Sequence, residues 1–467
     1  MFRAVKNIEK TKKIHVRNRH DTRNARGIIS FHRLRMDQVG QHMITIADIK
    51  HRGLCKGCGI CAGVCPSDAL DIRIDSNGNY SPFLDISRCK KCGLCAKVCP
   101  AYPIDMDKFN EFVFGKIPND TFLGNFINLY VGHSTDSKIR WESASGGLVT
   151  SLLIFALEEG IIDGAVVTKM KKDCPLETET TIAQNKEEIV SGNKSKYCPV
   201  SFDTAIKEIN RRHGRFAVVG LPCHIQGVRK AEMADTKLRK KIVLHFGLFC
   251  SHNMSFLGTE MLLQRLRARK EDVIKLEYRG GGWPGRLLII LKDGSEKIIP
   301  FSDYSSWLLS SFFFTPLGCL PCSDATNELS DISFGDAWLP ELRNDRIGQS
   351  IAITKTEVGE KLMREAFSKE KIKIIPVSDK KVLQSQQGLL QKKTKLAARR
   401  FVLKLFGCDI MNSQNPHFRI KDLLFATLTY LNLRASTNNH LQTLLKYMPT
   451  KVLRGYNLVY YTLSTRC

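Results

Sequence analysis

The chain has 467 residues, a length that predicts two to four structural units rather than one. Its apolar fraction of 43% is ordinary for a globular protein, and no segment has the roughly 18 consecutive apolar residues of a membrane span or the amino-terminal run of a secretory signal. The formal net charge of +25 favours acidic partners and anionic ligands, although basic tails alone would also produce it. We therefore expect a cytoplasmic globular protein.

The amino-terminal segment, residues 1–42, is basic and has no sustained hydrophobic periodicity. It carries eleven Lys or Arg against three acidic residues. This composition predicts an unstructured tail, or translation that starts downstream at Met43.

Residues 43–107 contain a duplicated cysteine run. Both copies have the spacing C-x2-C-x2-C-x3-C-P that is typical of proteins with two [4Fe-4S] clusters. Zinc, the alternative, usually takes two separated C-x2-C pairs and has no use for this density of thiols. In such runs the fourth cysteine points away and completes the other cluster. We therefore assign one cluster to Cys55, Cys58, Cys61 and Cys99, and the other to Cys89, Cys92, Cys95 and Cys65.

After a linker at 108–127, the pattern of residues 128–385 alternates between strands and helices, which predicts an α/β domain with parallel strands. A helical face ends at Gly160, and strands are expected at 165–168, 216–220 and 242–246. The overall fold class is thus multidomain α+β or α/β, with a small dicluster ferredoxin unit ahead of a larger α/β unit.

Two cysteines follow predicted strands, and a close pair lies further along the chain. Cys223 and Cys250 would emerge at the carboxyl edge of a parallel sheet, while Cys319 and Cys322 have the gap of a metal-binding loop. These residues predict a third cluster, with Cys198 as a weaker fifth candidate. Buried apolar cysteines, or zinc at the close pair, explain the spacing equally well.

Two loops are candidates for binding a flavin, the usual device that couples one-electron clusters to two-electron chemistry. The first opens a helix whose exposed amides could hold a phosphate, although a simple helix cap accounts for it as well: Ser145, Gly146, Gly147 and Thr150. The second, RGGGWPG, allows close backbone approach or is simply a hairpin loop: Arg279, Trp283 and Gly285. No G-x-G-x-x-G fingerprint is present, which disfavours a standard dinucleotide fold.

An ordered set of motifs resembles the family of coenzyme F-420 hydrogenase/dehydrogenase beta subunits. The motifs are SASGGLVTSLLIFALEEGIIDGAVV (143–167), SKYCPV (195–200), GLPCHIQGVRKA (220–231), GLFCSH (247–252), YRGGGWPG (278–285) and GCLPCSDATNELSDISFGDAW (318–338). The resemblance covers about 130–400, with a fused two-cluster ferredoxin ahead of it.

The resemblance implies an iron–sulfur flavoprotein oxidoreductase that binds FAD and exchanges hydride with coenzyme F-420. It supports Cys223, Cys250, Cys319 and Cys322 as ligands of a third [4Fe-4S] cluster. It also adds Lys196 and Gly220 to the residues around the flavin. No catalytic residue is assigned.

The electron partner is expected to be ferredoxin or another redox subunit. The alternatives are a ferredoxin-dependent flavoenzyme that reduces an organic substrate without F-420, and a non-catalytic electron relay. No nucleic-acid partner is expected, because the basic residues lie mainly in the tails without interleaved aromatic side chains.

The carboxyl-terminal region, 386–467, is predicted to be basic and helical. From Gly388 onward it has thirteen Lys or Arg and two acidic residues. Such a segment could contact a membrane surface peripherally, or it could be a solvated helical tail.

Overall fold

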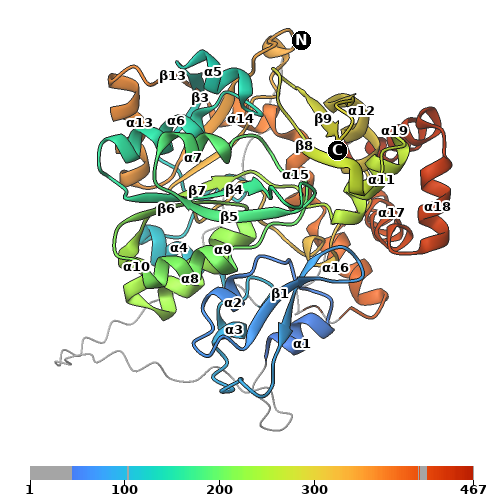
Figure 1. The fold of residues 1–467 in the computed structure, drawn as a ribbon, viewed down its shortest axis with the longest axis horizontal. Coiled ribbons are helices and arrows are strands. Elements are labelled where there is room, and N and C mark those ends of the chain that lie inside the picture. The colour runs from blue at the N-terminus through green and yellow to red at the C-terminus, as the bar shows by residue number, and fades with distance from the viewer. Residues whose placement is uncertain (1–44, 103–104, 409, 411–417, 466–467) are drawn as a thin grey trace, which may run out of the picture. The chain divides into compact units, whose positions relative to one another are not determined.

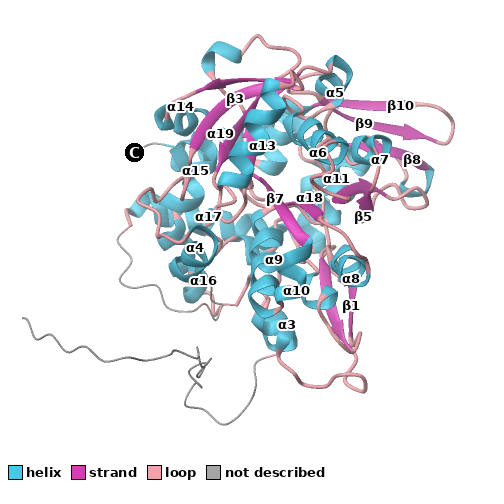
Figure 2. Cartoon of the chain, turned by 90° about the vertical axis from the view of Figure 1, so that its left-hand side faces the viewer, coloured by secondary structure: helices cyan, strands magenta, loops and turns pink. Residues whose placement is uncertain are grey.

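The computed structural model describes residues 45–102, 105–408, 410 and 418–465. The predicted amino-terminal tail, 1–42, lies outside these residues. Figure 1 shows the chain as a ribbon and Figure 2 shows it from the side, coloured by secondary structure. No helix of the described residues is both long and apolar enough to cross a membrane.

The cysteine-rich unit consists of short helices and strands, and each of its two cysteine runs contains one short helix. Its elements are α1 (Ile46–His51), α2 (Ile60–Gly63), β1 (Leu70–Ile74), β2 (Tyr80–Leu84) and α3 (Leu94–Lys97). The strands β1 and β2 pair antiparallel, with Leu70 opposite Leu84. Helices α2 and α3 each start after a left-handed glycine, Gly59 with φ 76° and Gly93 with φ 71°. A residue with a side chain adopts this conformation only at a cost, so glycine at this position sets the start of each helical turn.

The main sheet of the described residues is mixed rather than purely parallel. Its order is β13-β3-β12-β11-β7-β6-β4-β5. The strands are β3 (Asn128–Ser134), β4 (Gly164–Met170), β5 (Thr178–Ala183), β6 (Phe216–Gly220), β7 (Ile242–Leu248), β11 (Ile332–Asp336), β12 (Ser350–Thr354) and β13 (Ile372–Pro376). The expected strands at 165–168, 216–220 and 242–246 are β4, β6 and β7.

Strand direction decides which loops meet at one edge of this sheet. Strands β4, β6, β7 and β11 run parallel, and β12 is antiparallel both to β11 and to β3. Strand β3 therefore points the same way as the central strands. The loops after β3, β6, β7 and β11 consequently leave from one carboxyl edge, where ligands of open α/β folds bind.

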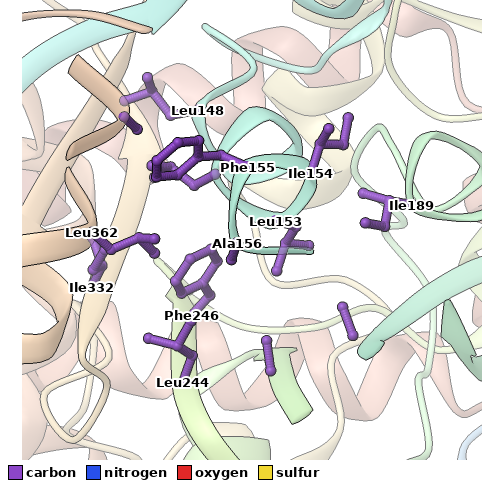
Figure 3. Close-up of a cluster of buried hydrophobic side chains, with 14 of the residues drawn as sticks. Leu148, Leu153, Ile154, Phe155, Ala156, Ile189, Leu244, Phe246, Ile332 and Leu362 are labelled. Carbon is purple, nitrogen blue, oxygen red and sulfur yellow. The ribbon is translucent and has the colours of Figure 1, made fainter. Parts of the chain in front are cut away.

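Helices cover this sheet and bury its apolar side chains. The helices of this part are α4 (Met106–Phe114), α5 (Ser137–Glu142), α6 (Leu148–Glu158), α7 (Lys186–Ser191), α8 (Asp203–Arg211), α9 (Pro222–Ala234), α10 (Thr236–Lys241), α11 (Phe256–Arg265) and α13 (Glu357–Ser368). The segment expected as a linker thus contains α4. Figure 3 shows Phe155 of α6 near Leu362 of α13, with Phe246 of β7 below them. Helix α6 is almost entirely apolar because it lies between the sheet and its neighbouring helices.

A smaller antiparallel sheet, with order β10-β9-β8, carries the glycine-rich loop. Its strands are β8 (Val273–Glu277), β9 (Arg286–Leu291) and β10 (Glu296–Pro300), followed by α12 (Phe301–Tyr304). The RGGGWPG segment connects β8 to β9 and is therefore a hairpin loop, as the simpler interpretation of its composition predicted.

The carboxyl-terminal region is helical and packs against the rest of the chain. Its helices are α14 (Asp379–Ser385), α15 (Gln387–Thr394), α16 (Leu396–Leu405), α17 (Ile420–Ser436), α18 (Asn439–Tyr447) and α19 (Thr450–Thr465). Side chains of α16 and α17 form an apolar cluster with Leu320, which lies between Cys319 and Cys322. A buried ion pair between Lys395 and Asp422 joins the two helices.

Candidate functional site

The first cysteine set lines a small pocket. Its lining includes all four thiols predicted to share one cluster: Cys55, Cys58, Cys61 and Cys99. Burial raises the pKa of Cys55 to about 12, with the charge of Cys99 adding to the effect. The fourth cysteine of the second run therefore lies with the first three of the first run, the exchange expected for a two-cluster fold.

The second cysteine set lies nearer the surface. Burial raises the pKa of Cys95, and the charges of Cys92 and Cys65 raise it further, so these three thiols are neighbours. Cys92 is exposed and Cys89 is half-buried. A cluster held here would be open to a partner protein.

The third set brings together cysteines that are distant in sequence. Cys223 lies in the first turn of α9 after β6, and Cys250 follows β7. Cys319 ends the short 3₁₀ helix Leu317–Cys319, and Cys322 lies in the loop between that helix and β11. Burial raises the pKa of Cys223 well above its ordinary value, and the charges of Cys58, Cys250 and Cys319 raise it further. The carboxyl ends of β6 and β7 therefore bring Cys223 and Cys250 toward the close pair, and the binding of one cluster by these four cysteines stays a prediction.

Cys198 lies elsewhere. It is fully buried in a second apolar cluster, and its thiol interacts with Tyr278 and Lys196. Among the described residues, no three His, Cys, Asp or Glu side chains are close enough to hold a single metal ion.

Two lysine side chains face the cysteine sets, Lys230 buried and Lys56 half-buried, and nothing in the motif spacing predicts them. Lys56 Nζ donates to Pro100 O at 3.3 Å, and Lys230 Nζ donates to Cys99 O at 2.7 Å. Burial opposes the charge of Lys56, but electrostatic attraction to Cys322, Cys223 and Cys319 raises the pKa of this lysine above its ordinary value. A buried ammonium is stable only beside negative charge, so these lysines suit the anionic character of thiolate-bound clusters.

The SASGG loop lies at the carboxyl end of β3. Ser145 Oγ donates to Gln349 O at 2.7 Å, and Gly146 N donates to Ser350 Oγ at 2.9 Å. Gly147 is left-handed, with φ 78°, and precedes α6, in whose first turn Thr150 is buried. A Cβ on Gly146 would lie 2.5 Å from Gly132 O, so close backbone packing alone requires glycine there.

Lys196 orders the loop that precedes it. Its Nζ donates to the carbonyls of Gly192, Asn193 and Lys194, at 2.6, 2.5 and 3.0 Å. Burial lowers the pKa of Lys196 to about 7. Three donated bonds use all the protons of an ammonium, so contact between Lys196 and a flavin stays a prediction.

Arg279 ties the two predicted flavin loops together. Its side chain is about 1% exposed, and it donates to Asp336 Oδ2 at 2.8 Å, to Tyr197 OH at 3.1 Å and to Ala144 O in the SASGG loop. Its Nε has no hydrogen-bond partner among the described residues. Gly285, which has φ 88°, closes the same loop.

Aromatic side chains gather next to this arginine. The rings of Trp283 and Trp338 are 4.6 Å apart, and Phe301 lies within 6.2 Å of Trp338. Trp283 is buried, yet its Nε1 has no partner among the described residues, whereas Trp338 and Trp141 are partly exposed. A planar ring system could stack here and accept a hydrogen bond, so these residues fit a flavin or a deazaflavin. The sequence analysis assigned no role to Trp338 or Trp141, although Trp338 ends the quoted motif at 318–338 and Trp141 lies just before the motif at 143–167.

Gly220 lies apart from these loops. It ends β6, and its carbonyl accepts a hydrogen bond from Asn327 Nδ2 at 2.8 Å. A Cβ there would lie 2.7 Å from His224 Cβ. Gly220 thus sits beside Cys223 rather than beside the aromatic cluster, and its contact with a flavin stays a prediction.

Models of known protein families match three parts of the chain. The model "4Fe-4S dicluster domain" matches residues 54–103. Two models of the coenzyme F420 hydrogenase/dehydrogenase beta subunit, one for its amino-terminal and one for its carboxyl-terminal part, match 129–207 and 213–380. The protein is thus an iron–sulfur oxidoreductase. It belongs to the family of coenzyme F-420 hydrogenase/dehydrogenase beta subunits, which confirms the resemblance stated from its motifs.

Individual relatives are moderately similar. The beta subunit of coenzyme F420 hydrogenase from Methanosarcina barkeri is 26% identical over 56% of this chain and 86% of its own length. The corresponding beta subunit from Methanothermobacter thermautotrophicus is 28% identical over 58% of this chain and 90% of its own length. A chain of the F420-reducing [NiFe] hydrogenase complex from Methanosarcina barkeri covers 62% of this chain and 96% of its own length, with 24% identity and a TM-score of 0.47.

Proposed function

We propose that this protein exchanges electrons between coenzyme F-420 and a protein partner, using FAD and three [4Fe-4S] clusters. The observation that carries the proposal is that Cys223, Cys250 and Trp338 each follow one of three parallel strands, so that they lie at the same carboxyl edge of the sheet. FAD, when bound, would supply the exchange between hydride chemistry and single electrons. The chain's own part is to hold the carriers close together and away from water.

The differences in exposure among the three cysteine sets support a path for electrons through the protein. Cys92 in the second set is exposed, whereas Cys58 and Cys61 in the first set and the third-set thiols are buried or half-buried. The charge of Cys95 raises the pKa of Cys61, so the second set lies near the first. The charge of Cys58 likewise raises the pKa of Cys223, so the first set lies near the third. Electrons would therefore exchange with a partner at the second set and with the flavin beyond the third.

Tight backbone packing holds the ferredoxin unit in this position. Phe202 N donates to Cys58 O at 3.0 Å, and Lys207 pairs with Asp68 at 2.8 Å. A Cβ on Gly318 would lie 2.3 Å from Leu54 O and 2.8 Å from Cys55 O. The loop of the third set thus touches the loop of the first set without intervening side chains, as a short electron route requires.

Basic residues around the second set favour an acidic redox partner such as a ferredoxin. Lys90 and Lys91 are exposed beside the exposed Cys92. Their positive charge would steer an acidic protein toward the one exposed thiol of this set.

A peripheral membrane contact through the carboxyl-terminal region stays a prediction. On α19, Leu458 and Val459 are exposed, and Lys451 is exposed on the same helix. Sedimentation with anionic and with neutral vesicles would measure such binding, which an amphipathic helix would make dependent on anionic lipid.

The decisive experiment follows flavin and cluster absorbance when anaerobically reconstituted protein is mixed with reduced F-420. We expect rapid bleaching, and about twelve iron atoms and one FAD per chain. Bleaching with reduced ferredoxin but not with reduced F-420 would refute the F-420 assignment and favour direct reduction of an organic substrate. A preparation that binds clusters but no flavin would instead favour a non-catalytic electron relay.

The partner surface has its own test. Replacing Lys90 and Lys91 by Glu should slow electron exchange with ferredoxin and weaken its dependence on salt, while reaction with F-420 is unchanged. Lys380→Glu, at an exposed position on α14, changes the charge without touching the second set and serves as the control. Equal slowing in both variants would contradict the proposed docking site.

A further inference from the structure

The helices beyond the family match place basic side chains against the third cysteine set. The family models end at residue 380, whereas α15 and α16 follow it. Lys392 of α15 is buried, and its Nζ donates to Cys250 O at 2.9 Å and to Asp324 O at 2.8 Å. This part of the chain therefore belongs to the surroundings of the third set.

Two arginines of α16 complete this arrangement. Arg399 is 1% exposed, and one of its terminal nitrogens donates to Lys392 O. Its Nε and Nη1, and the Nε of Arg400, are buried without a hydrogen-bond partner among the described residues. Arg400 donates to Pro321 O at 3.4 Å, between the close pair of cysteines.

Unpartnered guanidinium nitrogens in a protein interior carry a large desolvation cost unless an acceptor or an anion lies nearby. Burial lowers the pKa of Arg399 and of Arg400, and the nearby Cys322 opposes this shift in both; the same cysteine helps to raise the pKa of Lys392 against its burial. A thiolate-bound cluster offers both negative charge and sulfur acceptors at this place, so the cluster would satisfy these groups.

We propose that Lys392, Arg399 and Arg400 form a basic cap that makes the third cluster easier to reduce. This inference rests on the third cluster of the proposed function. Reduction adds one electron and therefore one negative charge, without forming or breaking a bond. Fixed buried cations stabilise the reduced form more than the oxidised form. The cap acts by position and charge and is not a catalytic group.

Arg399 is the residue to change, because Lys392 also holds the backbone carbonyl of a ligand cysteine. The variants are Arg399→Gln, which removes the charge, and Arg399→Lys, which retains it. Arg434→Gln, at an exposed position on α17, is the control. The readout is a redox titration of the intact reconstituted protein followed by electron paramagnetic resonance, with the third-cluster signal identified by its loss in Cys319→Ser.

We expect Arg399→Gln to lower the equilibrium constant for reduction of the third cluster by about tenfold, which is about 59 mV for a one-electron couple. Arg399→Lys should stay within about threefold of the unchanged protein, as should Arg434→Gln.

An unchanged constant in Arg399→Gln, with iron content retained, would overturn the cap. Equal shifts in Arg399→Gln and Arg399→Lys would also overturn it, because geometry and not charge would then be responsible. If Arg399→Gln fails to hold the cluster, Arg400→Gln decides by the same criteria. About eight iron atoms in the unchanged protein would instead refute the third cluster itself.

Discussion

Replacing Gly318 by Ala should loosen the contact between the first and third cysteine loops. The added Cβ would lie 2.3 Å from Leu54 O and 2.8 Å from Cys55 O, while ordinary contact begins near 3.4 Å. The third-set loop must therefore move by about 1 Å, because both obstacles are backbone atoms that cannot rotate aside. Such overpacking costs about 1–3 kcal/mol, of which restriction of the unfolded chain by alanine offsets about 0.4–1 kcal/mol.

Hydrogen–deuterium exchange is the suitable measurement because it reports local opening of these loops. Global unfolding of a protein with bound clusters would not be two-state and would give no single free energy. A net loss of about 1–2 kcal/mol predicts exchange roughly 5- to 30-fold faster in peptides that contain residues 53–57 and 317–322. Gly388→Ala is the control, because a Cβ there meets nothing within 4 Å. Unchanged exchange in Gly318→Ala would refute the claim that these loops are in rigid contact.

Three further predictions concern the buried network, the third set and the aromatic cluster. His245 lies 2.7 Å from a carboxylate oxygen of Glu232 and 2.9 Å from one of Asp331. Burial opposes the charge of His245, but these carboxylates raise its pKa above 6.5. The charged imidazole therefore stabilises the folded protein fully below pH 6.5, and this stabilisation is lost as the pH rises through the pKa of the folded state. The melting temperature should therefore fall from pH 6.5 to 9 in the unchanged protein but less in His245→Gln, and parallel curves would contradict this. Cys322→Ser should lower bound iron by about four atoms per chain, whereas Cys174→Ser should not, and equal losses would count against the third set. Trp338→Ala should lower the bound flavin with iron unchanged, by absorbance and iron assay, and full flavin retention would remove this residue from the site.

The sequence predicted those parts of the fold that depend on short-range patterns. The duplicated cysteine run predicted which thiols line the pocket of the first set, because the spacing itself constrains the backbone. Strands β4, β6 and β7 were expected from short runs of apolar residues, and the cysteines after β6 and β7 from the geometry of parallel strands.

The parts that could not be predicted depend on long-range packing. The antiparallel insertion of β12 between β11 and β3 makes the sheet mixed, and no local pattern specifies strand order. Lys230 and Lys392 resemble ordinary surface lysines in the sequence, since only the fold buries them. Trp338 and Trp141 likewise become neighbours of the glycine-rich loop only when distant segments meet.

The helices that lie against the third cysteine set have a consequence for shortened forms of the protein. Lys392 and Arg399 are almost fully buried, and the helices that carry them come after all four cysteines of this set in the chain. Removing α15 and α16 would therefore keep every cysteine of the set but leave these half-buried thiols without the basic side chains beside them.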